Sequence, residues 1–486
     1  YLEHVHLKGG GHGGDFCLDI ERPSSVPYKD ISVLDGLGNG VAVHGDGSFV
    51  FENLRVESNV SSSGSGLHIS GEADVVMNGL FISTTHSGQA IYVACHRLFL
   101  NHAEIRPLSG GQHGIKADDI TTFSITNSDI DCGKLSHRYA MYLSTGSDSN
   151  VLVKNVTFVG GISSLQYSFL QVHRSGIVNF HDNTLVGGQL YSGKPAVYVR
   201  EVAHFAAANN VATDVTTTRS HQWHIHAPNS VVLSNNTFER CNIEDQQEYS
   251  FLVIESSDID VKYNALSNME AHAIIEFRGS VDAIIFTHNS FIDPLVQFYV
   301  KTTSQYANVA GGVITIGPNF WSTTSFEELD RGAFDSTYDA DLATVEFQSL
   351  FIDRDMTENI VAPPPQILDE IERRISGTIS DEVIVNIPPG LYYAPGSIIL
   401  RHPKAQLVIQ GGVHIMFASH ASIRVDQGVL KIIGEDGSPV VLTPTHAVEY
   451  GDASIENSTV FDGILFGPNS NGTVFGGGGN EYVAGS

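Results

Sequence analysis

The amino-acid sequence predicts an all-β protein made of stacked coils, and three observations support this prediction. Short segments of the form apolar-x-apolar-x-Asn-x-apolar recur along the chain from Asn53 to Asn319. A second series of alternating apolar and polar residues keeps the same period, and such alternation is typical of strands that bury one face. Finally, 48 Gly and only 16% charged residues make the chain too apolar for disorder and too rich in Gly for a helical protein.

The recurring Asn residues set the length of the repeat, because neighbouring members lie 23 to 30 residues apart. They are Asn53, Asn78, Asn101, Asn127, Asn155, Asn183, Asn210, Asn236, Asn264, Asn289 and Asn319. A unit of about 26 residues with two or three short strands cannot bury its own apolar face, so such units must stack. The predicted fold is therefore a right-handed parallel β-helix, a solenoid with coils of about 26 residues. We expect the Asn side chains to occupy left-handed corners and to form one hydrogen-bonded ladder from coil to coil.

The repeat divides the chain into three predicted parts. Residues 1–322 form the parallel β-helix. Residues 323–380 contain the closure of this module, a spacer and short helices. Residues 381–486 begin a second parallel β-helix module, because short alternating strands punctuated by Gly and Pro resume there.

Two short helices are expected in the middle part. Ser325 and Glu328 have the spacing of a capping box, which predicts the start of a helix. Apolar residues from Ile367 to Ile375 follow three prolines at helical spacing and end at Gly377, which predicts a boundary helix. Residues 335–341 between them are expected to form a loop.

Two segments carry a resemblance to known modules. The run GLYYAPGSIILRHPKAQLVIQGGVHIMFASHASIRVDQGVLKIIGEDGSPVVLTPT and the later Gly463-Ile464-Leu465-Phe466 resemble the opening coils of β-helix modules in large secreted and cell-surface proteins. Asn319-Phe320-Trp321 and Val345-Glu346-Phe347 resemble the closing coil of the same modules. The combination is similar to the tandem modules in the extracellular region of the bark beetle (anakonda) family of animal junction proteins. This resemblance implies an extracellular scaffold of tandem modules.

The charge of the chain excludes several classes of partner. With 26 Lys+Arg against 54 Asp+Glu, the formal net charge is −28, and no run of Lys or Arg is present. Nucleic acids and anionic membranes attract basic stripes, so neither is an expected partner. No apolar run approaches the roughly 18 residues of a membrane span, and no direct membrane insertion is predicted. Residues 1–14 lack the charged and apolar regions of a signal peptide, which favours a mature form or an excised segment.

Five Asn-x-Ser/Thr sequons are compatible with secretion from a cell that glycosylates its proteins, although a chain rich in Asn, Ser and Thr also produces sequons by chance. They begin at Asn59, Asn155, Asn235, Asn457 and Asn471. We therefore expect a glycosylated extracellular protein or cell-surface ectodomain.

Functional residues of a β-helix must be sought across the coils, because outward side chains of one sheet form straight rows. One predicted row contains Ala42, His68, Tyr92, Lys116, Tyr142, Gln171, Tyr198, His224, Val253, Glu276 and Tyr299. The neighbouring row contains His44, Ser70, Ala94, Asp118, Ser144, His173, Arg200, His226, Glu255, Arg278 and Lys301.

The middle of these two rows combines side chains suited to carbohydrate chemistry. Polysaccharide lyases and uronate epimerases need a His or Tyr base and a cation that stabilises charge on the uronate, whereas glycosidases need carboxylates. The candidate catalytic residues are Tyr198, His224, Arg200, His173, His226 and Glu255. The candidate binding residues are Tyr92, Lys116, Tyr142, Tyr198, Arg200 and Arg278. The alternative is an ordinary solvated sheet, which favours the same residue types.

Two functions are consistent with the sequence. The first is a non-enzymatic extracellular structural or adhesion scaffold of tandem β-helix modules that binds protein or glycan partners. The second is a polysaccharide lyase, epimerase or glycosidase that acts across the outward sheet face. The module boundary and the lack of a convergent set of carboxylates or metal ligands favour the scaffold.

No metal site or cofactor is predicted, with calcium as the one alternative. His4, His6 and His12 with Asp15 lack the spacing of a defined set of metal ligands. The acidic pairs Asp118-Asp119 and Asp129 with Asp131 could attract calcium, although neither belongs to an Asp-x-Asp-x-Asp-Gly loop.

The four cysteines are predicted to be unpaired and largely buried. Cys132 and Cys241 both follow their repeat Asn by five residues, yet they lie four coils apart, which is about 19 Å along a stack with the spacing of paired strands. A disulfide needs Cα atoms within about 7 Å. Cys95 belongs to the second strand series, and Cys17 lies about three coils before it.

Overall fold

A computed structural model of the chain contains two compact units. Unit 1 comprises residues 1–310, 315–333 and 347–360, and unit 2 comprises residues 311–314, 334–346 and 361–486. The structure describes residues 2–9, 16–36, 39–58, 64–84, 88–107, 113–132, 139–160, 168–190, 193–245, 248–279, 283–303, 313–335, 342–361, 368–369, 373–379, 382–394, 396–418, 421–435, 437–444, 463–466, 473–477 and 480–484.

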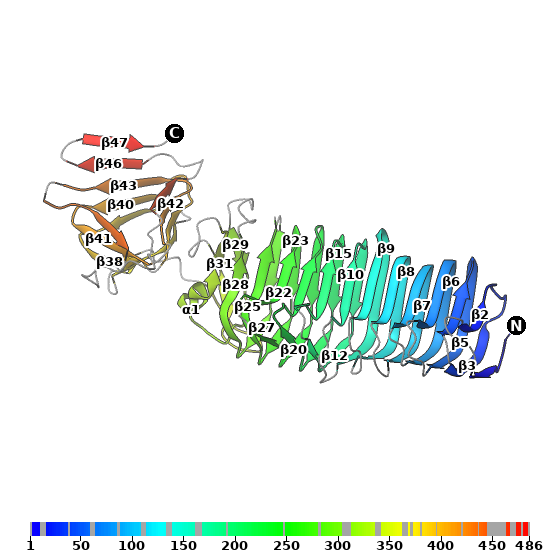
Figure 1. The fold of residues 1–486 in the computed structure, drawn as a ribbon. Coiled ribbons are helices and arrows are strands. Elements are labelled where there is room, and N and C mark those ends of the chain that lie inside the picture. Colours follow the sequence, from blue (N-terminus) through cyan, green and yellow to red (C-terminus); the bar gives the residue numbers. More distant parts are fainter. Residues whose placement is uncertain are drawn as a thin grey trace, which may run out of the picture. The chain divides into compact units, whose positions relative to one another are not determined.

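Unit 1 is a parallel β-solenoid whose coils stack in chain order, as Figure 1 shows in blue to green. Its strands are β1 (His6–Lys8), β2 (Phe16–Ile20), β3 (Tyr28–Gly36), β4 (Asn39–His44), β5 (Gly47–Ser58), β6 (Ser65–Thr84), β7 (Gln89–Pro107), β8 (His113–Asp131), β9 (Tyr139–Val159), β10 (Leu170–His173), β11 (Ile177–His181), β12 (Thr184–Val186), β13 (Gln189–Leu190), β14 (Val197–Arg200), β15 (His204–Ala208), β16 (Val211–Thr213), β17 (Thr216–Thr218), β18 (Trp223–His226), β19 (Ser230–Ser234), β20 (Thr237–Glu239), β21 (Asn242–Glu244), β22 (Ser250–Glu255), β23 (Asp258–Lys262), β24 (Ala265–Ser267), β25 (Glu270–Arg278), β26 (Ala283–Thr287), β27 (Ser290–Ile292) and β28 (Leu295–Thr302). The predicted all-β fold is therefore confirmed.

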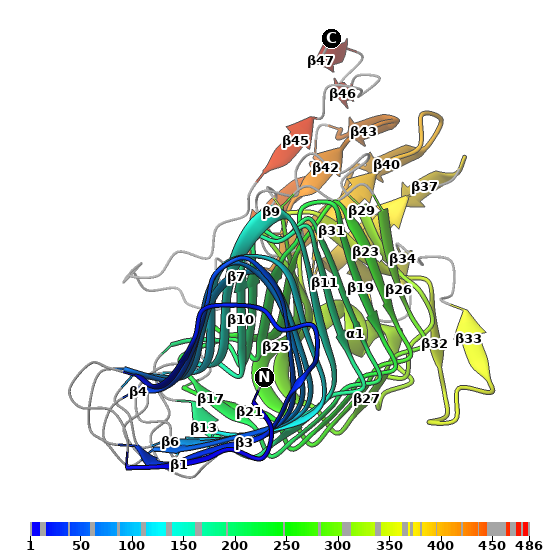
Figure 2. The same ribbon diagram turned by 90° about the vertical axis from the view of Figure 1, so that its right-hand side faces the viewer.

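The strands divide each coil into sides that pair with the same sides of the next coil. In the early coils one long strand such as β9, with 21 residues, runs through several sides. In later coils the same path is split into short strands, so that β9 pairs in parallel with β10, β11 and β12 at once. Figure 2, which looks along the stack, shows the coils superposed in cross-section.

The core of unit 1 follows from the alternation seen in the sequence. In β8, for example, Ile115 and Ala117 are fully buried and Lys116 between them reaches the surface, and the same holds for Phe123 and Ile125 with Ser124 between them. Burying an apolar side chain of this size stabilises the fold by about 1.5–3 kcal/mol, and each coil contributes several. A single coil exposes these side chains at its ends, so the neighbouring coils are part of its core.

The predicted pairing of the two rows is confirmed from β4 to β25 and is wrong in the last coil. Four members of the rows that were predicted to face outward are instead buried: Ala42, Gln171, Val253 and Glu276. Tyr198 pairs with Gln171 on one side and with His224 on the other, and Glu255 pairs with His226 and with Arg278. In the last coil, however, Lys301 rather than Tyr299 lies beside Glu276.

The shift in the last coil has a simple cause. Ile275 and Phe277 alternate along β25, so the apolar pattern alone permits Val300 to pair with either of them. In the structure Val300 pairs with Ile275 and Thr302 pairs with Phe277. This register brings the Lys301 ammonium into the same row as the Glu276 carboxylate.

The recurring Asn residues form two ladders rather than one, so the expectation of a single ladder is wrong. An outer ladder occupies the left-handed corner: Asn127 and Asn155 have φ of 50° and 53°, and Asn155 Nδ2 donates to Asn127 Oδ1 at 2.8 Å. From the next coil on, Asp182 takes that corner with φ of 57°, and the repeat Asn is its neighbour Asn183. The repeat Asn therefore moves from the corner to the position that follows it between Asn155 and Asn183, a change of one residue that the variable spacing of the repeat does not reveal.

The inner ladder is buried and continuous. Its six members are 0–4% exposed, and each Nδ2 donates to the Oδ1 of the next member at 2.8–2.9 Å. The same Oδ1 atoms also accept from backbone N–H groups of the preceding member, at 2.8–3.1 Å. The members are Asn183, Asn210, Asn236, Asn264, Asn289 and Asn319. The ladder therefore satisfies buried backbone groups at a corner where strand pairing cannot reach them.

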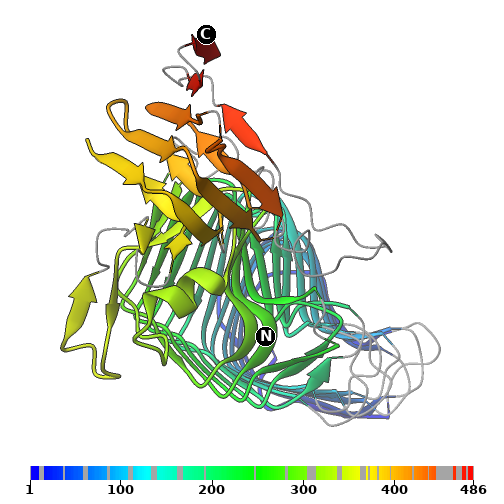
Figure 3. The same cartoon turned by 90° about the vertical axis from the view of Figure 1, so that its left-hand side faces the viewer.

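The last coil of unit 1 ends in an aromatic cluster and a short helix. The Trp321 ring is fully buried and stacks on Phe291 with ring centroids 4.4 Å apart. Helix α1 (Phe326–Arg331) begins after Ser325, whose hydroxyl accepts from the Glu328 N–H, so the predicted helix start is confirmed. The capping box itself is not closed, because the Ser325 N–H donates to Thr323 Oγ1 and not to Glu328. Figure 3 shows α1 lying against the green coils at this end.

Five short strands lie between residues 313 and 361, a stretch that both units share. They are β29 (Val313–Ile316), β30 (Ala333–Phe334), β31 (Thr344–Phe347), β32 (Ser349–Phe351) and β33 (Asn359–Val361). Most of the loop expected at residues 335–341 lies outside the described residues.

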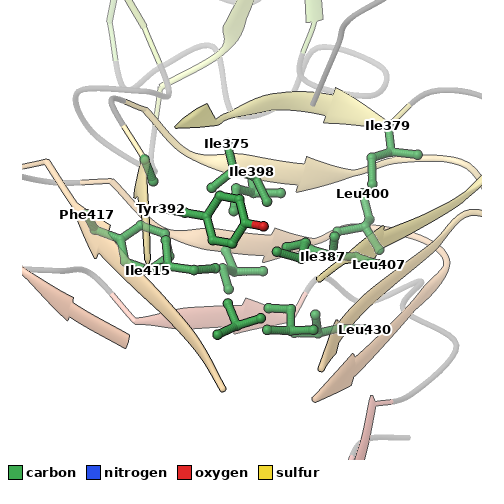
Figure 4. Close-up of a cluster of buried hydrophobic side chains, with 14 of the residues drawn as sticks. Ile375, Ile379, Ile387, Tyr392, Ile398, Leu400, Leu407, Ile415, Phe417 and Leu430 are labelled. Carbon is green, nitrogen blue, oxygen red and sulfur yellow. The ribbon is translucent and has the colours of Figure 1, made fainter. Parts of the chain in front are cut away.

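Unit 2 consists of three small sheets around its own core. Its strands are β34 (Leu368–Asp369), β35 (Arg374–Ile375), β36 (Gly377–Ile379), β37 (Ile384–Ile387), β38 (Gly390–Ala394), β39 (Ile398–Leu400), β40 (Gln406–Gln410), β41 (Val413–Phe417), β42 (Ile423–Val425), β43 (Val429–Ile433), β44 (Val441–Pro444), β45 (Ile464–Phe466), β46 (Thr473–Gly477) and β47 (Asn480–Ala484). The pairs β34–β35 and β46–β47 are antiparallel, and the other paired strands for which the register is known are parallel. Tyr392, Ile398, Leu407, Ile415 and Phe417 are at most 1% exposed and fill the space between the sheets (Figure 4).

The boundary helix predicted from Ile367 to Ile375 is wrong for the residues that the structure describes. Leu368 pairs with Ile375 across the antiparallel strands β34 and β35. Ile375 is fully buried in the core of unit 2. The spacing of the apolar residues fits both a helix and a tight pair of strands, and burial of Ile375 between sheets favours the strands.

All four cysteines lie within the described residues and none forms a disulfide, which confirms that part of the prediction. Cys95, Cys132 and Cys241 are buried, whereas Cys17 is half-buried. Burial raises the pKa of Cys95 and of Cys241 to about 12, and it also raises that of Cys132. Because the thiolate is the reactive form, these three thiols should be inert.

We therefore expect iodoacetamide to leave Cys95, Cys132 and Cys241 unmodified in the folded protein at pH 8 and to modify all four cysteines after denaturation without reductant. Mass spectrometry of the two samples checks this. A pair of cysteines that stays protected in denaturant would reveal a disulfide and contradict the coil register.

The inner ladder predicts a large effect for Asn236→Ala. The substitution removes an amide that donates to Asn264 and to the Ala207 carbonyl and leaves the buried amide of Asn210 without its acceptor. We expect the free energy of unfolding to fall by about 3 kcal/mol. Trp223 and Trp321 are both buried in unit 1, so tryptophan fluorescence in urea follows this unit.

The matched control is Asn209→Gly in the outer ladder, where Asn209 is exposed, has φ of 56° and donates through its side-chain amide to Asp182. Glycine tolerates this corner, so we expect a loss below about 1 kcal/mol. Equal losses for the two variants would show that the inner ladder is not specially stabilising.

Candidate functional site

The outward face is the surface of the side that contains β4, β10, β14, β18, β22 and the corresponding parts of β6–β9, β25 and β28. Rings from successive coils contact each other along it. Ring centroids lie 4.9 Å apart for His68 and Tyr92, 5.8 Å for His173 and Tyr198, and 5.4 Å for Tyr198 and His224. The parallel register that stacks the coils therefore produces a row of half-buried aromatic and imidazole rings.

Four of the six candidate catalytic residues lie side by side on this face, each in contact with the next. His173 contacts Tyr198, which contacts His224, and His224 Nε2 lies 3.0 Å from Glu255 Oε1. The hydrogen bond with His224 lowers the pKa of Glu255 below its usual range, although partial burial opposes this. His224 and Glu255 thus form a polarised pair beside the Tyr198 ring.

The other two candidates flank this group. His226 pairs with Glu255 in the strand register and helps to lower the pKa of that carboxyl. Arg200 is exposed at the end of β14, and its Nε lies 3.2 Å from Glu201 Oε1. All six candidates therefore lie within a few coils of one another, as the predicted rows require.

Glu276 anchors a second group of charges that sequence reasoning placed on the outward face but did not recognise as buried. Glu276 is only 1% exposed. Its carboxylate accepts from Arg278 Nε at 2.7 Å and from the Ser250 hydroxyl at 2.6 Å, and Lys301 Nζ lies 3.7 Å away. Burial alone would raise the pKa of Glu276, but these cations and the hydroxyl lower it below its usual value.

Arg278 joins the two groups. Its Nη1 lies 3.8 Å from Glu255 Oε1, while its Nε is hydrogen-bonded to Glu276. Charges this far from water need partners, and removing one partner of such a network typically costs about 3–5 kcal/mol. Arg278, a predicted binding residue, is therefore mainly a bridge between two carboxylates.

His221 is a functional-site residue that the predicted rows missed. It precedes β18 and is 9% exposed, and its ring packs against His224 and Tyr249. His221 Nδ1 lies 3.0 Å from the Ser250 backbone nitrogen and 3.1 Å from the Ser250 carbonyl oxygen, and Nε2 lies 3.5 Å from Arg278 Nη2. Since it lies outside the strand, only its repeated His-x-x-His spacing with His224 could have signalled it.

The remaining candidate binding residues lie on the same face but some coils away. Lys116 Nζ lies 5.3 Å from the centroid of the Tyr92 ring and 2.7 Å from Asp118 Oδ2. Burial, with the nearby Asp118, raises the pKa of Tyr92. Tyr142 contacts the His173 ring at 5.8 Å. These side chains extend the row of rings toward the early coils and do not join the group around Glu255.

The residues of the outward face are better suited to binding a ligand than to acid–base catalysis by a pair of carboxylates. Glu276 is enclosed and has three partners, so it cannot reach a substrate. Of the other carboxylates beside the candidate residues, Glu255 is engaged with His224, and Glu201 is engaged with Arg174 and Arg200. Tyr198, Arg200 and His226 are the groups that face outward with polar atoms available.

The other sites predicted from the sequence add little. Among the described residues no group of three or more His, Cys, Asp or Glu is placed to hold a metal ion. His4 Nδ1 lies 3.0 Å from Asp30, while His12 and Asp15 lie outside the described residues. Of the five sequons, Asn155 and Asn235 are described and exposed, and Asn59, Asn457 and Asn471 lie outside the described residues. No helix in the described part of the chain has the length and apolar character to cross a membrane.

His221 makes the stability of unit 1 depend on pH. Burial lowers its pKa to about 4; Glu276 opposes this shift, whereas Arg278 and His224 add to it. Below the unfolded pKa of about 6.5 the unfolded chain binds a proton that the folded chain refuses, so stability falls as the pH falls. By about pH 4 the loss should approach 3 kcal/mol.

We expect His221→Asn to flatten this dependence, because the Asn amide can accept from Ser250 but does not titrate. The measurement is the urea midpoint by tryptophan fluorescence between pH 7 and pH 5, above the range in which most carboxylates titrate. Parallel curves for the variant and the wild type would contradict the role of His221.

The comparisons with known proteins agree with this fold. Residues 20–185 match the family model described as a right handed beta helix region. No curated protein and no solved structure matched the chain. The match covers the early coils, and the strand register carries the same solenoid on through the coils that contain Tyr198 and Glu255.

Proposed function

We propose that this chain is a non-enzymatic structural or adhesion scaffold of tandem β-helix units whose outward face binds an extended glycan. The observation that carries the proposal is the row of rings and cations that runs across the coils on this face. The rings of His68, Tyr92, Tyr142, His173 and Tyr198 repeat with the coils, which lie about 4.8 Å apart. A straight, rigid row of this kind suits a linear polymer, because each coil can contact a successive part of the ligand.

The state of the carboxylates favours binding over catalysis. A glycosidase needs two carboxyl groups that reach the scissile bond. In this face Glu276 is buried among Ser250, Arg278 and Lys301, and Glu255 is paired with His224. The buried charges hold the coils in place, and the exposed rings and cations remain for a ligand.

The setting of the proposed scaffold is outside the cell. The exposed sequons at Asn155 and Asn235 are compatible with it. The resemblance of the closing and opening coils to the modules of bark beetle (anakonda) junction proteins supports the same setting and a protein partner in addition to glycan.

A second candidate is a polysaccharide lyase or epimerase. It is favoured by one observation, the contact of Tyr198 with His224 beside the His224–Glu255 pair. Such a group can remove a proton from a sugar carbon, and Arg200 can stabilise the negative charge that results.

Tyr198 separates the two functions. For a scaffold, Tyr198→Phe keeps the ring and should change glycan affinity little, whereas Tyr198→Ala should weaken it about 10-fold. Binding is measured on an array of linear neutral, uronic and sulfated glycans. Tyr263→Ala is the control, because Tyr263 is 55% exposed at another corner.

The same glycans also test the enzyme. Incubation with the wild type should release no unsaturated sugar product. Robust turnover that is lost in Tyr198→Phe or in His224→Ala would overturn the scaffold proposal and establish the lyase.

A further inference from the structure

Three cations gather around Tyr198, although the chain as a whole carries a net charge of −28. Lys194 Nζ lies 6.0 Å from the centroid of the Tyr198 ring. Arg200 follows Tyr198 by two residues on β14, and Arg174 directly follows the strand β10 that pairs with β14. All three are exposed.

One carboxylate lies within ion-pair distance of these cations among the described residues, and it belongs to Glu201. Arg174 Nε lies 3.2 Å from Glu201 Oε2, and Arg200 Nε lies 3.2 Å from Glu201 Oε1. Each oxygen of the carboxylate thus faces a different guanidinium. Three positive charges against one negative charge leave this patch with a local excess of positive charge.

The pKa of His173 reflects the same excess of positive charge. Its pKa is lowered first by burial and then by Arg200, and Lys194 and Arg174 lower it further, while Glu201 alone opposes them. Elsewhere on the outward face the cations lie directly beside carboxylates of their own coil or the next, as Lys116 does with Asp118 and Lys301 with Glu276. The patch around Tyr198 therefore differs from these balanced pairs, because it has more cations than carboxylates.

We propose that Lys194, Arg200 and Arg174 bind a carboxylate or sulfate group of the glycan, and that Glu201 is an internal counter-ion which this group displaces. The proposal rests on the proposed glycan-binding function and names the charge of its ligand. A guanidinium binds a planar carboxylate or a sulfate through two parallel N–H donors. The Tyr198 ring and His173 lie beside the patch and would contact the sugar that carries the anionic group.

Displacing the Glu201 carboxylate from Arg174 and Arg200 costs little free energy, because these ion pairs are exposed. The side chains of Arg174, Arg200 and Glu201 are 74%, 52% and 41% exposed. Ion pairs this exposed contribute little to stability, because water screens them and the side chains lose conformational freedom. The two guanidiniums can therefore exchange one carboxylate for another at small cost, while Lys194 adds attraction that Glu201 does not satisfy.

The experiment measures binding of oligogalacturonate, heparin oligosaccharide and cello-oligosaccharide of matched length to the whole chain by calorimetry. We expect the two anionic probes to bind at least 10-fold more tightly than the neutral one, and their order identifies carboxylate or sulfate as the preferred group. Lys194→Ala and Arg200→Ala should each weaken anionic binding about 10-fold. Glu201→Gln should strengthen it several-fold, because it removes the competing carboxylate.

Lys154→Ala is the matched control and should change little, because Lys154 is an exposed cation 3.9 Å from Asp182 in the part of β9 that pairs with β11, on another side of the coil. Tryptophan fluorescence in urea checks that each variant is folded. Unchanged or weaker anionic binding in Glu201→Gln, or neutral and anionic probes bound equally, would overturn the inference and leave the scaffold function intact. Failure of all three probes to bind would overturn the glycan-binding function itself.

Discussion

The structure depends on one constraint, the strict parallel register of each coil on the next. Backbone pairing sets the spacing between coils, but it permits a slip along the strand, and a slip of one residue would exchange the buried and outward faces. The inner Asn ladder opposes such a slip, because each buried amide bonds both to the side chain and to the backbone of its neighbour. Residues about 26 positions apart in the chain, such as Tyr198 and His224, consequently lie in contact on the surface.

This constraint explains which features could be predicted from the sequence. Periodicity alone placed Tyr198, His224 and Glu255 on one face, because a repeat with a constant register converts spacing along the chain into adjacency in space. The prediction was wrong where the pattern is degenerate. Two alternating apolar residues in β25 allowed two positions for Val300, and the apolar residues from Ile367 to Ile375 fitted both a helix and two strands. The burial of Glu276 and His221 was also beyond the sequence, since it depends on neighbours that periodicity does not place.

The outward face contains buried charged side chains that stabilise the coils and other side chains that remain at the surface. Glu276, Arg278 and Lys301 compensate one another within a region from which water is largely excluded, and such a network holds a particular arrangement because an unpaired member is costly. Glu255 and His224 lie at its edge, where His224 Nε2 is within hydrogen-bond distance of the Glu255 carboxylate. Catalysis by this edge would require the pair to open, whereas binding by the rings beside it requires no rearrangement. The geometry thus places rigidity and recognition on the same sheet.

The cluster of Arg174, Arg200 and Lys194 is significant because the chain as a whole is acidic. A net charge of −28 repels anionic polymers over most of the surface, and the Debye length of about 8 Å at physiological salt limits how far any one patch acts. An anionic glycan can therefore bind only where the local charge is reversed. Arg174, Arg200 and Lys194 provide such a place beside the ring of Tyr198, and Glu201 bridges the two guanidiniums in the absence of ligand. Cations at fixed positions beside one ring also make the position of a bound chain specific, because other registers along the face would leave its anionic group without these partners.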